Sequence, residues 1–88
     1  MSENEGISEA TLRELIASGA VRSVAVVGQG PDWAVQVEVG MRRRALRSAR
    51  EPVRLWRSMD RLSRWLRERG IAEWRVDARH YNPGQRPV

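Results

Sequence analysis

The stretch VRSVAVVGQGPDWAVQVEV, residues 21–39, decides the fold class of this chain. Residues 21–27 are rich in β-branched side chains, QGPD at positions 29–32 is a turn signal, and residues 33–39 alternate strictly between two faces. This pattern predicts a β-hairpin. We expect the core to lie against the face of the second strand that carries Trp33 and the alternate valines that follow it.

A short helix is expected before the hairpin. Ser8 is placed to cap this helix, Ile7 and Leu12 are placed to pack against each other across the cap, and Gly19 is the expected left-handed stop. The apolar stripe of this helix is narrow. The helix therefore depends on packing against the rest of the domain.

Further strands are expected after the hairpin. Gly40 should bend the chain into a third strand at residues 41–47, and a short fourth strand at residues 53–56 is expected to pair with that third strand across a turn. A last strand is expected at residues 71–76, where Trp74 and Val76 alternate with charged side chains.

A second helix is expected from about Ser58 to Arg69, because apolar residues recur there at helical spacing and Gly70 follows. The sequence thus predicts a small single α+β domain with the order helix, three- or four-stranded antiparallel sheet, helix, strand. Its 88 residues suffice for one core. The domain is expected at residues 7–78, between a disordered tail at 1–6 and a flexible tail at 79–88.

Positive charge is concentrated in the middle of the chain. The sequence holds sixteen arginines, no lysine and eleven acidic residues, a net charge of +5. Residues 1–41 carry a net −4, residues 42–69 a net +8 and residues 70–88 a net +1. A basic segment of this kind attracts phosphate backbones or an acidic protein surface.

The expected third strand and second helix supply the candidate nucleic-acid-binding residues. Neighbours on a strand point to opposite faces, so at most two of the three consecutive arginines at 42–44 can share a surface. A charged, solvated edge strand that resists aggregation is the alternative interpretation of this run. The candidate residues are Arg42, Arg43, Arg44, Arg47, Arg57, Arg61 and Arg64.

Four tryptophans in so short a chain raise the alternative of base stacking. Trp33 and Trp74 are in phase with valines on their strands, and either Trp56 or Trp65 is in phase with the leucines of the second helix. Core packing therefore accounts for three of the four. The remaining one of Trp56 and Trp65 is the expected surface residue.

Residues that carry catalysis or bind metals are sparse. The chain has no cysteine and a single histidine, His80, which we expect to be solvated. Gly28-Gln29-Gly30 resembles the start of a phosphate-binding loop, but the third glycine and the following helix are missing, so a turn is the better interpretation. We expect no enzyme activity, no metal site and no cofactor.

Nothing in the sequence indicates export or membrane insertion. Residues 1–6 are acidic and lack an apolar segment, and no apolar run approaches the roughly 18 residues of a membrane span. The absence of cysteine is compatible with a reducing compartment. A cytoplasmic protein is expected.

Over residues 12–81 the sequence resembles the ParC-type partition-associated proteins, small proteins carried by plasmids and conjugative elements. The matching positions are mostly structural residues, so the resemblance implies a shared fold and a bacterial accessory factor encoded near partition or transfer genes. They are Leu15, Gly19-Ala20-Val21-Arg22-Ser23-Val24, Gly28, Trp33-Ala34, Gly40, Leu46, Val53-Arg54-Leu55-Trp56, Asp60, Arg64-Trp65-Leu66-Arg67, Gly70-Ile71 and Val76-Asp77.

Two functions remain open from the sequence. The first is DNA binding in plasmid partition or maintenance, through the arginines of the third strand and second helix. The second is a non-catalytic adaptor or homodimer, in which these arginines meet an acidic protein surface and a strand edge or tryptophan anchors the contact.

Overall fold

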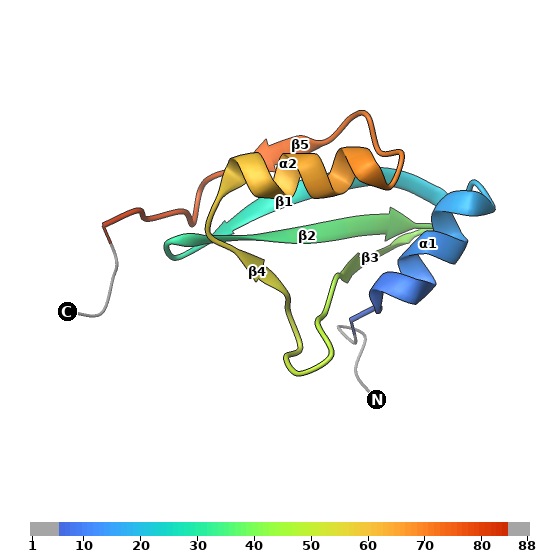
Figure 1. The fold of residues 1–88 in the computed structure, drawn as a ribbon, viewed down its shortest axis with the longest axis horizontal. Helices are drawn as coiled ribbons and strands as arrows, with labels where there is room; N and C mark the ends of the chain where they lie inside the picture. The colour runs from blue at the N-terminus through green and yellow to red at the C-terminus, as the bar shows by residue number, and fades with distance from the viewer. Residues whose placement is uncertain (1–5, 85–88) are drawn as a thin grey trace.

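Two helices pack against one sheet in this protein (Figure 1). The structure is a computed structural model, and it describes residues 6–84. Its elements are α1 Glu9–Ala17, β1 Val21–Gln29, β2 Asp32–Val39, β3 Arg42–Ala45, β4 Leu55–Trp56, α2 Met59–Glu68 and β5 Arg75–Asp77. The small single α+β domain expected from the sequence is confirmed.

The five strands form one mixed sheet in the order β3-β2-β1-β5, with β4 beside β2. β1, β2, β3 and β4 pair antiparallel, whereas β5 runs parallel to β1. A parallel neighbour needs a crossover connection, and α2 lies in the connection that returns the chain to the far side of β1.

Both hairpin turns have two residues and place glycine first. Gln29 pairs with Asp32 around Gly30 and Pro31, and Val39 pairs with Arg42 around the second turn. The leading glycines, Gly30 and Gly40, have φ of +63° and +62°. Glycine adopts this backbone conformation without a steric penalty, and it suits the twist of the flanking strands. The hairpin expected at residues 21–39 is thereby confirmed.

The core lies between the sheet and the helices. α2 places three buried side chains, Leu62, Trp65 and Leu66, in the same cluster as the inward valines of β1 and β2. α1 adds Leu12, which is fully buried, and Ser8 caps the helix as predicted by accepting from the Thr11 N–H. Burying each large aliphatic side chain contributes roughly 1.5–3 kcal/mol.

The opposite face of the sheet carries no helix within the described residues; we call it the helix-free face. It bears the alternate residues of the strands, which are mostly small or polar: Ser23, Ala25, Val27, Ala34, Gln36, Glu38, Arg43 and Ala45. A groove of about 460 Å³ lies on this face between Arg43 and the β5 segment.

The expected pairing of the fourth strand with the third is wrong. β4 pairs with β2, through Trp33 opposite Trp56 and Ala34 opposite Leu55. β3 pairs with β2 only at residues 36–39. The edge of β2 that β3 leaves free, at the other end of β2, is the one that pairs with β4. Pairing there also brings the Trp56 ring to 5.2 Å from that of Trp65.

The boundary of the folded domain lies beyond the expected residue 78. Tyr81 stacks on Trp33 with ring centroids 4.1 Å apart, and the backbones of His80 and Asn82 hydrogen-bond to Gly30. Residues 79–82 therefore belong to the packed domain, although the sequence analysis placed them in the tail. Residues 85–88 of that expected tail, and residues 1–5 of the other, lie outside the described residues.

The assignment of the surface tryptophan is also corrected. Trp56 and Trp65 are both buried, with 8% of each residue exposed, so neither is the surface residue that was expected. Trp74 is the partly buried one, because β5 begins only at Arg75 and the segment before it leaves the sheet.

Candidate functional site

The exposed side of α2 carries arginine. Leu62, Trp65 and Leu66 face the sheet, and the arginines at positions 61, 64 and 67 of the same helix are exposed. Ser58 fixes the start of the helix, because its hydroxyl accepts from the Arg61 N–H at 3.2 Å. The exposed arginines of the helix are Arg61, Arg64 and Arg67, and Arg57 is exposed just before the cap; together we call these four the α2 arginine face.

Most charges of the α2 arginine face have no local counterion. Arg57 forms an ion pair with Asp32 at 3.4 Å. Among the described residues, Arg61, Arg64 and Arg67 form no ion pair, although all three are exposed. Like charges at helical spacing repel by a few tenths of a kcal/mol per pair. The face thus concentrates positive charge that an anionic partner can neutralise.

Other arginines of the basic segment have a structural role around Glu9, which we call the Glu9 network. Arg69 donates from Nε to Glu9 Oε2 at 3.1 Å and also pairs through its terminal nitrogen. Arg54 and Arg13 approach the same carboxylate at 3.8 and 3.3 Å. Arg54 lies 4.4 Å from the Trp56 ring centroid, and Arg69 lies 4.1 Å from that of Trp65. The network joins α1, the segment before β4, and the end of α2.

The electrostatics of Glu9 follow from this arrangement. Hydrogen bonds from Arg69 lower the pKa of the Glu9 carboxyl from its usual value, and the charges of Arg69, Arg13 and Arg54 act in the same direction against partial burial. Near Tyr81, hydrogen bonds from Arg79 likewise lower the pKa of Asp77. Both carboxylates are therefore stabilised as anions by arginines that are engaged within the fold.

The structure divides the three consecutive arginines of β3 between the two faces of the sheet. Arg42 and Arg44 pair with Val39 and Val37, whose side chains lie on the helix-covered side, whereas Arg43 pairs with Glu38 on the helix-free face. The alternation expected from the sequence holds here. Arg43 therefore points away from α2 and does not share a surface with the α2 arginine face.

The chain's own N-terminal segment pairs with the end of β3 and the residues just after it. Ile7 donates to Ala45 C=O and accepts from the Arg47 N–H, both at 2.9 Å. Arg47 itself is exposed beyond the end of β3. The sequence-predicted site is thus brought together only in part. Arg61 and Arg64 share the exposed side of α2, with Arg57 just before its N-cap, whereas the arginines at 42–44 and 47 are distributed along β3 and the residues that follow it.

One outward arginine and one cleft were not predicted from the sequence. Arg67 belongs to the α2 arginine face and could have been found by extending the helical spacing from Arg64. The cleft lies between β1 and the segment at residues 70–75, with a volume of about 740 Å³. We call it the β1 cleft; no local sequence signal marks it, since its walls come from distant parts of the chain.

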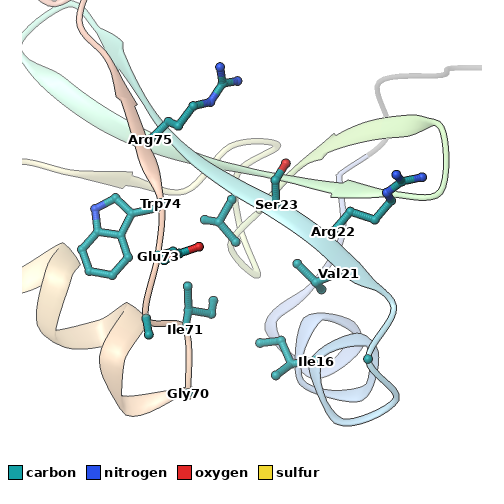
Figure 2. A pocket seen from close by; sticks show the side chains of 12 residues that line it. Ile16, Val21, Arg22, Ser23, Gly70, Ile71, Glu73, Trp74 and Arg75 are labelled. Atoms are coloured by element: carbon teal, nitrogen blue, oxygen red, sulfur yellow. The ribbon is translucent and has the colours of Figure 1, made fainter.

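Figure 2 shows how the β1 cleft is lined. The apolar side chains of Ile16, Val21 and Ile71 gather on its inner side, and Trp74, on the same segment as Ile71, turns its ring away from β1 toward α2. Arg22, Ser23 and Arg75 point away from this apolar floor, toward the helix-free face.

The cleft exists because β5 is short. β5 pairs with β1 only at residues 25–27, and residues 21–24 of β1 have no strand on that side within the described chain. A β-bulge also lies at this end of β1, where the register shifts between Val21 and Ser23 and leaves Arg22 as the extra residue. The sheet therefore has an open edge beside the cleft.

Comparison with known protein families identifies the family of this chain. A family model described as ParC-like matches residues 7–85, which is most of the chain. No curated protein and no solved structure matches the sequence. In the described part of the chain, no helix has the length and apolar character needed to cross a membrane, and no group of three or more side chains could hold a metal ion.

Proposed function

The chain belongs to the ParC-like family, a membership that suggests a plasmid-related role, and we propose that it acts there as a non-catalytic, DNA-binding accessory protein of partition or maintenance. The α2 arginine face is the proposed contact surface. Its guanidinium groups would lie along the phosphate backbone of a duplex, which positions a protein on DNA without specifying a sequence.

The observation that carries this proposal is the division of the arginines into two groups. Arg13, Arg54 and Arg69 neutralise Glu9 and pack on tryptophan rings, whereas Arg61, Arg64 and Arg67 are exposed without an ion-pair partner among the described residues. The first group has a structural explanation. The like charges of the second group repel one another, Asp60 and Glu68 on the same helix offset only part of that repulsion, and a phosphate backbone would relieve the remainder.

Arginine rather than lysine suits this role. Guanidinium presents a planar set of donors that match phosphate oxygens, and its positive charge persists throughout the physiological pH range. The three residues lie on one rigid helix whose inner side is anchored by Leu62 and Leu66, both fully buried. Their spacing is therefore fixed before any partner binds.

The proposal is tested by fluorescence anisotropy with a labelled DNA duplex at two salt concentrations. We expect micromolar or tighter binding that weakens as salt rises, with the negative log–log slope produced by counterion release. The double variant Arg61→Gln/Arg64→Gln should bind at least tenfold more weakly and reduce the magnitude of the salt slope by about 2.

A matched control removes the same number of charges from the other side of the sheet. Arg43→Gln/Arg75→Gln affects exposed arginines near the groove on the helix-free face and should change affinity by less than threefold. Absence of binding by the unaltered protein at low salt would refute the proposal. Equal losses in both double variants would show that net charge, not the α2 arginine face, governs binding.

A second candidate function is protein interaction, and the β1 cleft is the observation that favours it. An open strand edge with an apolar floor is suited to a polypeptide rather than to a phosphate backbone. The two functions use different surfaces and are compatible in one molecule.

A further inference from the structure

We infer that the β1 cleft binds an extended segment of a partner protein, in which apolar and acidic residues alternate, by adding it as a strand beside β1. This site is separate from the α2 arginine face and does not depend on DNA binding. Three features of the site support it: the open edge of β1, the two chemically different sides of the cleft, and the charges at its rim.

The open edge supplies the backbone contacts. The backbone groups of successive residues in a strand point to opposite edges. The Leu46 N–H donates to the Val35 C=O, so the backbone groups of Val35 point toward β3. Those of the next residue, Gln36, therefore point toward β1. Ala25 pairs with Gln36, so its backbone N–H and C=O point toward β2. The backbone groups of its neighbours Val24 and Val26 therefore point toward the opposite edge of β1. β5 occupies that edge only at residues 25–27. A strand added at residues 21–24 would continue the ladder where β5 has diverged.

The cleft has room for such a segment. The unpaired part of β1 is four residues long, and four extended residues span about 13 Å. The volume of about 740 Å³ lies within the range of roughly 300–1,000 Å³ found for ligand sites. A short strand therefore fits without displacement of β5.

The two sides of the cleft determine which side chains the partner segment carries. Successive residues of a strand point to opposite faces. On the inner side, an added strand would meet the apolar side chains of Ile16, Val21 and Ile71 (Figure 2). Every second residue of the partner is therefore apolar.

The outer side of the cleft selects negative charge. Arg22 and Arg75 are both exposed, one on each wall, and point to the same side of the sheet (Figure 2). The bulge directs Arg22 to this side next to Ser23. Glu73 is the single carboxylate among the lining residues. The residues of the partner that alternate with its apolar ones are therefore acidic.

The test uses the full chain and a phage-displayed library of random twelve-residue linear peptides as the probe. We expect selected peptides to alternate apolar and acidic residues. Synthetic copies should bind with at least tenfold lower affinity to Arg22→Glu/Arg75→Glu than to the unaltered protein. Hydrogen exchange should show peptide-dependent protection of backbone amides at residues 21–24, which a contact confined to the α2 arginine face would not produce.

The control variant is Arg61→Glu/Arg64→Glu, which carries the same change in charge on α2. Its affinity for the peptides should lie within threefold of that of the unaltered protein. Circular dichroism should verify the fold of both variants. Failure to enrich peptides, a larger loss of binding in the α2 variant, or protection away from residues 21–24 would overturn the inference. DNA binding is measured separately, so its failure leaves this result interpretable.

Discussion

Glu9 is the residue on which the charged interactions within the fold converge. Its carboxylate contacts Arg13, Arg54 and Arg69, and Arg69 has only 14% of its side chain exposed. We predict that Glu9→Gln lowers the free energy of unfolding by about 1 kcal/mol at pH 7, since a partly buried arginine loses its charged acceptor. Urea unfolding at pH 7 measures the loss.

The same substitution has a defined pH dependence. The pKa of Glu9 is lowered in the folded state relative to 4.5, so its stabilising contribution is present above that pH and is lost as pH falls through the folded value. The difference in the free energy of unfolding between Glu9→Gln and the unaltered protein should therefore become smaller as the pH is lowered. Glu14→Gln, on the same helix, is the control and should change stability little; a Glu9 effect independent of pH would contradict this explanation.

Gly28 is required for space rather than for an unusual backbone conformation. A Cβ at this position would lie 2.5 Å from the Tyr81 Cβ and 2.8 Å from its backbone N and Cα. We predict that Gly28→Ala lowers the free energy of unfolding by about 1–3 kcal/mol through overpacking. Thermal and urea denaturation measure this loss, and the change should also separate Tyr81 from Trp33.

Gly84→Ala is the matched control for Gly28→Ala. Within residues 6–84, the nearest atom to a Cβ at this position would be the Asn82 Oδ1 at 3.7 Å, which is an ordinary contact. Stability should change by less than about 0.5 kcal/mol. Equal effects of the two substitutions would show that close approach of Tyr81 is not the cause.

At the scale of elements, α2 determines the geometry of the proposed DNA contact, and Ser58 determines where α2 starts. We predict that Ser58→Ala lowers the free energy of unfolding by about 1 kcal/mol, because the Arg61 N–H loses its acceptor at the first turn. Ser63→Ala, within the same helix, replaces serine with a better helix former and should not destabilise. Chemical denaturation of both variants tests this, and a greater loss with Ser63→Ala would contradict the capping role.

The elements that could be predicted from the sequence are those that local chemistry specifies. The β1–β2 hairpin follows from its turn residues and alternation, and α1 follows from Ser8 and the apolar spacing after it. The partner of β4 could not be predicted, because it depends on how much of β2 remains uncovered by β3. The late start of β5 is likewise a tertiary effect, and it leaves Trp74 partly buried, whereas Trp56 and Trp65, one of which was the expected surface residue, are both buried.

At the scale of the whole molecule, the sequence shows that arginine is concentrated in residues 42–69. It does not show which of these arginines join the Glu9 network and which are exposed on the α2 arginine face. Glu9 is 60 residues from Arg69 along the chain, and no local pattern shows that this acid engages arginines so distant. The register of β3 then directs Arg43 to the face opposite α2. What remained predictable was the helical spacing of Arg57, Arg61 and Arg64, which places them on one exposed side.

The most direct test of the proposed DNA-binding surface is an NMR titration of the isotope-labelled protein with a DNA duplex at low salt, followed through backbone amide and arginine side-chain signals. We predict that the perturbed signals are those of the α2 arginine face, with Arg61, Arg64 and Arg67 changing most. Perturbations centred on Arg43 and the helix-free face, or no perturbation on saturating addition of DNA, would contradict the proposal.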